Sequence, residues 1–254
     1  MKGQEVLAAH VPELQEGRGP LIVGIILAAF SAASAALLAV DRLGPAWSGA
    51  GQVLALSLGF LWSAQFYWRR REYQARWGSL AYRNAFARHM LLGVPVMFAA
   101  IAHTPYLPGE PIRFGWAAPL VWLAGLYLAL TGALLYVRSY GVFGVDRLAA
   151  LYVYFPAEGR LVNSSIYGIL RHPAYSGLVR IGLALGLWGG TWLSLPVGLF
   201  MPIGLTLWLR LVEEPELIER FGARYAEYRK SVPAFWPRAR DASAFLKFLI
   251  AGEA

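Results

Sequence analysis

Titratable side chains gather at the two ends of one long apolar stretch in the last third of the chain. The first group, in residues 167–177, contains an arginine, a histidine and two tyrosines. The second group, in residues 213–228, begins with two adjacent glutamates and continues with further glutamates, arginines and tyrosines. Residues 178–212 are mostly apolar, so folding this stretch back on itself would bring the two groups together. The side chains expected to meet are Arg171, His172, Tyr175, Arg210, Glu213, Glu214, Tyr225 and Tyr228.

This mixture of side chains suits a polar, zwitterionic cofactor. An arginine can hold a carboxylate bidentately, a glutamate can accept both hydroxyls of a ribose, and a tyrosine ring can lie over an adenine or near a sulfonium cation. The apolar helices would offer a route for a lipid-dissolved substrate. We therefore expect group transfer between a water-soluble donor and a membrane-soluble acceptor.

The sequence lacks the patterns that indicate other kinds of site. The chain has no cysteine and no cluster of histidines and carboxylates at ligand spacing, so no metal site is predicted. A glycine-rich GxGxxG loop is also missing, which argues against a soluble dinucleotide-binding or methyltransferase domain. No Ser/His/Asp arrangement stands out.

The composition is typical of a membrane protein. Of the 254 residues, 57% are hydrophobic and 15% are charged, whereas soluble domains carry about 25% charged residues. The formal net charge of +8 is explained by basic residues that flank apolar spans. No zinc-finger, RNP or helix-turn-helix pattern accompanies that charge, so nucleic-acid binding is not expected.

The apolar segments predict an all-α, polytopic helical bundle. A length of about 20 apolar residues is enough to cross a bilayer. Gly189-Gly190 divides the last apolar stretch into a helical hairpin. Lysine and arginine are concentrated in the loop 69–89, in residues 138–171 and beyond Arg210, which predicts cytoplasmic termini and a cytoplasmic site in a bacterial-type inner (plasma) membrane. The six predicted crossings are residues 20–40, 52–68, 90–107, 114–137, 173–188 and 191–212.

The same signals divide the chain into five regions. These are a cytoplasmic arm (1–19), a four-helix membrane region (20–137), an interfacial connector (138–170), a catalytic region with the hairpin (171–238) and a tail (239–254) with a surface helix near 245–250. Within the connector, residues 148–155 are too short to cross, and we expect them to lie in the interface as a lid or lateral wall over the site.

Several individual residues have competing interpretations. Tyr67 and its aromatic neighbours at the end of the second span fit an interfacial belt. His103 is expected to be a hydrogen-bonded interfacial residue. Arg180, inside a span, would either face a cavity or partner or extend to the cytoplasmic boundary. An apolar stripe at helical spacing is expected to dock the last charged helix on the membrane core; it consists of Leu217, Phe221, Tyr225 and Tyr228.

Three motifs in order extend this interpretation. The first is Arg171-His172-Pro173-x-Tyr175-x-Gly177. After the hairpin come Glu213-Glu214-x-x-Leu217-x-x-x-Phe221-Gly222-x-x-Tyr225-x-x-Tyr228 and then Val232-Pro233. Together these three parts resemble the signature of the isoprenylcysteine carboxyl methyltransferase family. That family is related to the membrane phospholipid N-methyltransferases. The resemblance covers the last third of the chain. Two departures are Ser165-Ile166-Tyr167-Gly168 where the family often has Gly-Pro-Tyr, and an insert at 138–162.

The resemblance implies an integral membrane enzyme that uses S-adenosyl-L-methionine and acts in contact with membrane lipids. Arg171 would sit near the reacting end, and Glu214 is the candidate base for an acceptor that must lose a proton, with His172 as an alternative. Arg171 and Glu214 are therefore the expected catalytic residues. The residues expected to bind the cofactor are Tyr167, His172, Tyr175, Gly177, Glu213, Glu214 and Tyr225.

Three functions remain open at this stage. The first is carboxyl O-methylation of a lipophilic or lipidated substrate, which needs no strong base because a carboxylate is already a nucleophile. The second is N-methylation of a phospholipid or small amine. The third is an NADPH-dependent sterol or enone reductase, although such enzymes would carry Arg-Asp-Glu where this chain has Val212-Glu213-Glu214. A scaffold or transporter would need a polar path through the bundle, and the first four spans have almost none.

Overall fold

The protein is a bundle of long helices. The computed structural model describes residues 3–252, so the ends of the predicted arm and tail, residues 1–2 and 253–254, lie outside the described residues. Within the described part, the β pairing consists of an isolated bridge between Pro111 and Thr191, and the prediction of an all-α protein is confirmed. The long helices are α3 (Gly19–Leu43), α4 (Ser48–Trp68), α7 (Leu91–His103), α8 (Ala118–Phe143), α11 (Pro173–Gly189) and α12 (Ser194–Trp208).

Shorter helices join and cover the long ones. At the end of the bundle that carries the site, the chain forms α13 (Glu214–Phe221) and α14 (Ala223–Ser231). The other short elements include α1 (Gln4–His10), α2 (Pro12–Gln15), η1 (Pro45–Trp47), α5 (Arg70–Trp77), η2 (Gly78–Leu80), α6 (Ala81–Ala85), η3 (Phe86–Met90), η4 (Thr104–Tyr106), η5 (Gly115–Ala117), α9 (Val145–Leu148), η6 (Leu151–Val153), η7 (Pro156–Glu158), α10 (Ile166–Ile169), η8 (Leu209–Glu213), η9 (Ala239–Asp241) and α15 (Ala242–Ala251).

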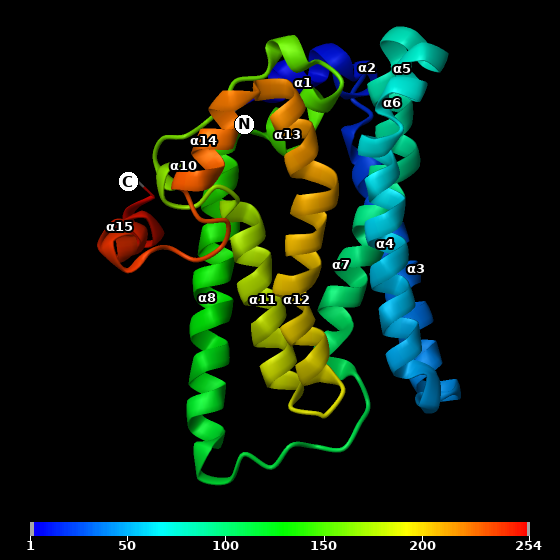
Figure 1. Ribbon diagram of the computed structural model, residues 1–254. Helices are drawn as coiled ribbons and strands as arrows, with labels where there is room; N and C mark the ends of the chain where they lie inside the picture. The colour runs from blue at the N-terminus through cyan, green and yellow to red at the C-terminus, as the bar shows by residue number, and fades with distance from the viewer. Residues whose placement is uncertain (1–2, 253–254) are drawn as a thin grey trace.

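Four helical stretches of the described residues are long and apolar enough to cross a membrane. They are Gly19–Leu43, Arg70–Tyr106, Gly115–Phe143 and Ser194–Phe221. Large apolar side chains are exposed along them, as expected where lipid is the surrounding medium. Helices α4 and α11 occupy the other two predicted spans, but six crossings and cytoplasmic termini stay predictions. Both ends of the described chain lie at the end of the bundle that carries α13 and α14 (Figure 1).

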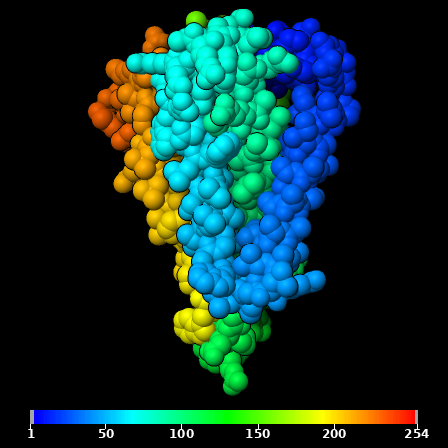
Figure 2. All heavy atoms as spheres, turned by 90° about the vertical axis from the view of Figure 1, so that its right-hand side faces the viewer, coloured from blue at the N-terminus to red at the C-terminus, as the bar shows by residue number. Residues whose placement is uncertain are grey.

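The long helices form two groups. Helix α11 packs against α8 and α12, whereas α7 packs against α3 and α4, and Figure 1 shows the groups side by side. In the perpendicular view the molecule is broad at the end that carries α1 and α5 and narrows toward the loop between α7 and α8 (Figure 2). The broad end holds most of the short helices, and a space between the two groups opens there.

Glycines set how closely the hairpin packs. A Cβ atom on Gly186 would lie 2.8 Å from the Cα of Gly198, and one on Gly198 would lie 2.7 Å from the Cα of Gly186. Small residues allow such close approach of helices in lipid. Gly190 adopts φ +59° and caps α11, so the predicted turn at Gly189-Gly190 is confirmed. The side chains of Thr191 and Ser194 then cap each other's backbone N–H at the start of α12.

The second arm of the hairpin continues beyond the predicted end at residue 212. A π-helical turn, η8, joins α12 to α13 without a break. Gly222, with φ +57°, ends α13, so the apolar stripe predicted on one helix spans two helices. Its members Leu217, Phe221, Tyr225 and Tyr228 nevertheless form one hydrophobic cluster with Leu161 of the connector.

Two predictions about the ends of spans need correction. Phe66 and Tyr67 are buried, and only Trp68 of that aromatic trio is exposed, so the trio is not an interfacial belt. His103 is hydrogen-bonded, to Asp41 at 2.8 Å and Gln52 at 3.2 Å, but it is buried between helices instead of lying at an interface.

Arg180 pairs inside the protein. Its Nη1 atom donates to the backbone oxygens of Ser176 at 3.1 Å and Phe235 at 3.2 Å. Its guanidinium carbon lies 4.3 Å from the centre of the Trp236 ring. Of the two alternatives for Arg180, a protein partner is therefore correct, and the arginine ties α11 to the segment after α14. The predicted helix near 245–250 is confirmed as α15, whose Phe245 also contacts this guanidinium.

The connector is more buried than the sequence indicates. Within residues 148–155, Leu151, Tyr152, Val153 and Tyr154 are all buried. The Tyr154 hydroxyl donates to the backbone oxygen of Phe66 at 2.9 Å, which fastens the connector to α4. This segment is therefore part of the protein core that joins the two helix groups, and not a strip lying in the interface.

We predict that Gly198→Ala lowers the free energy of unfolding by about 1–3 kcal/mol, because its methyl group would collide with the backbone of α11. Gly204→Ala, on the same helix, is the control: the nearest atom to its new methyl is on the Phe200 ring at 3.5 Å. The control should be neutral or gain up to about 1 kcal/mol from helix propensity. Thermal unfolding in detergent measures both, and equal effects of the two substitutions would contradict the packing argument.

Candidate active site

A cavity of about 660 Å³ lies between the two helix groups at the broad end of the molecule. This volume is within the range of sites for small molecules. One part of the wall is polar and comes from the start of α11, from η8 and from α13 and α14. The other part is apolar and comes from α3 and α7, with side chains such as Phe30, Val94 and Phe98. Leu148, Ala150, Tyr152 and Val153 of the connector also line the cavity, which agrees with the predicted lateral wall.

The two titratable groups meet at this cavity because the chain turns back at Gly190. Two backbone hydrogen bonds then hold the start of α11 against residues 233–234. The Arg171 N–H donates to the Pro233 oxygen at 2.9 Å, and the His172 N–H donates to the Ala234 oxygen at 3.3 Å. The start of α11 is therefore clamped directly to the segment that follows α14.

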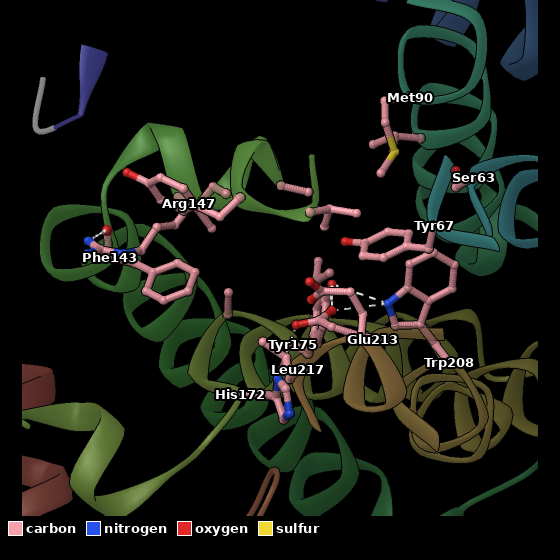
Figure 3. A pocket seen from close by; sticks show the side chains of 18 of the residues that line it. Ser63, Tyr67, Met90, Phe143, Arg147, His172, Tyr175, Trp208, Glu213 and Leu217 are labelled. Carbon is pink, nitrogen blue, oxygen red and sulfur yellow. Dashed lines mark hydrogen bonds and ion pairs between the residues drawn. The ribbon is translucent and has the colours of Figure 1, made fainter. Parts of the chain in front are cut away.

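Of the two adjacent glutamates, Glu213 is the one that faces the cavity. It accepts hydrogen bonds from the Tyr175 hydroxyl at 2.5 Å and from the Trp208 Nε1–H at 3.3 Å, both at Oε2. Its Oε1 atom lies 3.5 Å from Nδ1 of His172. Figure 3 shows these four side chains together on one wall. The neighbours fix the orientation of this carboxylate.

Glu214 lies behind that wall. It is 2% exposed and is not among the residues that line the cavity. Its Oε1 atom accepts from Arg171 Nε at 2.8 Å and lies 3.4 Å from both His172 Nε2 and the Tyr225 hydroxyl. Arg229 approaches its other oxygen at 3.5 Å. Because a buried carboxylate is costly without such partners, Glu214 is suited to holding Arg171 and His172 in place.

His172 bridges the two carboxylates. Burial opposes its charged form, but the hydrogen bonds to Glu213 and Glu214 outweigh burial and raise the pKa of the imidazole. Both ring nitrogens then donate, Nδ1 toward Glu213 and Nε2 toward Glu214. An imidazolium has no lone pair to accept a proton, so this arrangement does not favour His172 as a general base.

Two predicted cofactor-binding tyrosines line the cavity. Tyr167 stacks on Phe143 with ring centres 4.9 Å apart, and its backbone oxygen accepts from the Tyr228 hydroxyl at 2.6 Å. Tyr225 contacts His172: the Tyr225 hydroxyl lies 3.3 Å from the Nε2 atom of the imidazole. Burial raises the pKa of both tyrosines, so they are neutral phenols at physiological pH.

Gly177 is placed differently from the other predicted site residues. It does not line the cavity; a Cβ atom there would lie 2.7 Å from the backbone oxygen of Gly132 on α8. The structure therefore gives Gly177 a packing role between α11 and α8. Arg171, Tyr167, His172, Tyr175, Glu213 and Tyr225 line the cavity, whereas Gly177 and Glu214 do not. What each contributes to binding or catalysis stays a prediction.

Several cavity residues were missed by the sequence reasoning. Glu216 is 3% exposed and pairs with Arg220 at 3.1 Å, a pair that its i, i+4 spacing could have indicated. Arg147, Tyr67 and Ser63 also line the cavity. They come from the connector and α4, far along the chain, and no local pattern connects them with the motifs.

Comparisons with known proteins find that the central part of the chain is similar to methyltransferases. Residues 120–224 match the model of a family described as phospholipid methyltransferase. A methanethiol S-methyltransferase of Pseudomonas deceptionensis is 31% identical over 127 residues, which are 48% of this chain and 45% of that protein. The match thus spans under half of the relative's length. No solved structure matches the chain. The predicted resemblance to this group of methyltransferases is confirmed.

The pKa of His172 predicts how stability depends on pH. A histidine whose pKa is raised on folding adds stability below its unfolded pKa of about 6.5, and that stability is lost as pH rises through the folded pKa. The thermal midpoint of the wild type should therefore be higher than that of His172→Asn. This difference in midpoint should be largest at about pH 6 and should become smaller toward about pH 9. Paired melts across this range test it, and a gap that widens with pH would show that the imidazole is neutral.

Proposed function

We propose that this protein is an S-adenosylmethionine-dependent methyltransferase of the membrane that acts on a lipophilic substrate, with carboxyl O-methylation as the reaction. The observation that carries this proposal is a single cavity with a polar wall from the motif region and an apolar wall from membrane helices. The first wall suits a water-soluble donor, and the second suits an acceptor that arrives from lipid. The family match and the methyltransferase relative support the reaction class.

The residues present fit the proposed cofactor. Glu213 and Glu216 offer carboxylates to an ammonium group or to ribose hydroxyls, and Arg220 has a buried Nε–H without a hydrogen-bond partner among the described contacts. Tyr167 and Tyr225 offer neutral aromatic faces for adenine or for a cation. When bound, the cofactor supplies an electrophilic methyl group on a sulfonium. The protein's own contribution is then to orient the reactants and exclude water.

The choice of acceptor follows from where the two expected bases lie. Glu214 is behind the wall, and the hydrogen bonds of His172 to two carboxylates raise the pKa of its imidazole and favour its protonated form. A carboxylate needs neither, because its oxygen forms the new bond to the methyl group while the methyl–sulfur bond breaks and no proton moves. A protonated amine would first have to lose a proton, which makes N-methylation of a phospholipid or small amine the weaker alternative.

S-methylation is a second candidate because the relative's name specifies methanethiol as its substrate. A thiol is mostly protonated at neutral pH and, unlike a carboxylate, must lose its proton before or during the transfer, so S-methylation ranks below O-methylation on this ground.

The surplus of arginines near the cavity end of the bundle also supports the proposal that the site faces the cytoplasm of a bacterial-type inner membrane.

Titration calorimetry of the detergent-purified protein with S-adenosylhomocysteine tests the cofactor assignment. We expect Glu213→Gln to weaken binding roughly 10- to 100-fold, as for loss of a hydrogen bond to a charged group. Glu219→Gln is the matched control, because Glu219 lies on the same helix but is exposed and pairs with Arg70 and Arg71 outside the cavity. The control should bind like the wild type.

The alternatives give different results in the same experiment. Binding of NADPH and not of S-adenosylhomocysteine would favour the reductase. Binding of neither by a folded sample would favour a scaffold. Equal affinity of Glu213→Gln and wild type would mean that the cofactor does not use this wall.

A further inference from the structure

We propose that two hydroxyl groups on α4, those of Tyr67 and Ser63, form the binding site for the polar head of the methyl acceptor, and that this head is anionic, a carboxylate or a thiolate. This inference rests on the proposed methyltransferase function and deepens it. It assigns the recognition of the substrate to the first half of the chain, which the motifs do not include.

Neither hydroxyl has a hydrogen-bond partner among the described residues, although both residues are buried. Ser63 is 3% exposed and Tyr67 is 6% exposed, and both line the cavity. The Ser63 Oγ atom is itself fully buried, and the charged neighbours of the Tyr67 phenol are Glu213, Glu216 and Arg220. Leaving a buried hydroxyl unpaired is costly, so these groups are suited to a partner that enters the cavity.

Their positions make them one site. Residues four apart on a helix lie on the same face, one turn from each other, so Ser63 and Tyr67 point to the same side of α4. In Figure 3 the Tyr67 hydroxyl points across the cavity toward the wall that carries Glu213. The Tyr67 ring is perpendicular to that of Trp208, with centres 5.6 Å apart, and Trp208 in turn donates to Glu213. A head group at Tyr67 would therefore lie beside the polar wall.

The apolar part of the cavity continues from this point. Gly93 of α7 lies against Ser63, since a Cβ atom on Gly93 would be 2.5 Å from the Ser63 Oγ, and Val94 and Phe98 of α7 line the cavity beyond it. If the polar head of the acceptor binds at the hydroxyls of Ser63 and Tyr67, the hydrocarbon tail of the same molecule can lie along α7. The arrangement suits an amphiphile with a single small head.

The nearby carboxylates leave the Tyr67 hydroxyl free as a donor. Glu213 already accepts from Tyr175 and Trp208, and Glu216 accepts from Arg220. A free phenol is a good hydrogen-bond donor, so its best partner is a head with lone pairs and negative charge.

The charges around the cavity favour the same choice. Four arginines and two glutamates line it, and one of the arginines, Arg171, is neutralised by Glu214 behind the wall. Positive charge remains in excess even before a cationic cofactor is added. The charged neighbours of Tyr67 itself are Glu213, Glu216 and Arg220, so it is the surplus over the whole cavity that favours a carboxylate or thiolate head over an ammonium head.

Four probes that share one hydrocarbon tail separate the head from the tail: dodecanoate, dodecanethiol, dodecylamine and dodecane. Binding of radiolabelled dodecanoate to the full-length protein in nanodiscs is measured with and without S-adenosylhomocysteine, and the other probes compete. We expect dodecanoate to bind, dodecanethiol to compete more strongly as the pH is raised toward the pKa of its thiol, and dodecylamine and dodecane to compete weakly.

Tyr67→Phe should weaken dodecanoate binding roughly 10- to 100-fold, and Ser63→Ala roughly 2- to 10-fold. Tyr154→Phe is the matched control, because it removes a buried phenol from the same region whose hydroxyl bonds to the backbone of Phe66 outside the cavity. It should bind dodecanoate like the wild type. The affinity of Tyr67→Phe for S-adenosylhomocysteine should stay within about twofold of the wild type, which also shows that the variant is folded.

Three results would overturn the inference. Unchanged dodecanoate binding in Tyr67→Phe would remove the hydroxyl pair from the acceptor site. Competition by dodecane as strong as that by unlabelled dodecanoate would mean that the cavity selects only the tail, and preference for dodecylamine would exclude an anionic head. Parallel loss of S-adenosylhomocysteine binding would assign Tyr67 to the cofactor. If the wild type itself binds no S-adenosylhomocysteine, the proposed function fails, while the probe comparison still reports on the α4 hydroxyls.

Discussion

The arrangement of the site depends on one buried carboxylate. Glu214 sits where the start of α11, η8 and α14 converge, and it bonds to or closely approaches Arg171, His172, Tyr225 and Arg229. A charge in that position is tolerated only because cations and hydroxyls surround it. The same contacts draw together parts of the chain that are about 40 to 60 residues apart. The contacts that stabilise the Glu214 carboxylate therefore also orient the His172 imidazole and the Arg171 guanidinium, which line the cavity.

The π-helical turn η8 gives two adjacent glutamates opposite surroundings. Consecutive residues on a helix point about 100° apart, so Glu213 reaches the cavity while Glu214 turns into the protein. π turns are frequent at functional sites. Here the turn also carries Trp208, just before it, toward Glu213. The motif's paired glutamates thus have separate tasks, one in the cavity and one in holding its wall.

Much of the fold could be predicted from local signals. Runs of apolar residues located the long helices, and Gly189-Gly190 located the hairpin turn that brings the two titratable groups together. The rest depends on contacts between distant segments. Nothing near Glu214 indicates that it faces inward, because the π turn has no sequence signature. The burial of residues 148–155 and of Tyr67 follows from packing between the connector and α4, and neither segment shows its partner in its own pattern.

The two walls of the cavity come from different parts of the gene product. The family match, residues 120–224, includes most of α8 and all of α11, α12, η8 and α13, but it leaves out α3, α4 and α7. Substitutions in those three helices can change the apolar wall and remove or add hydroxyl groups there, while the motif residues of α11, η8 and α13 stay the same. Evolution could therefore exchange one acceptor for another while the donor side stays fixed. Proteins that share this motif are then expected to share a methyl donor and to diverge in what they methylate.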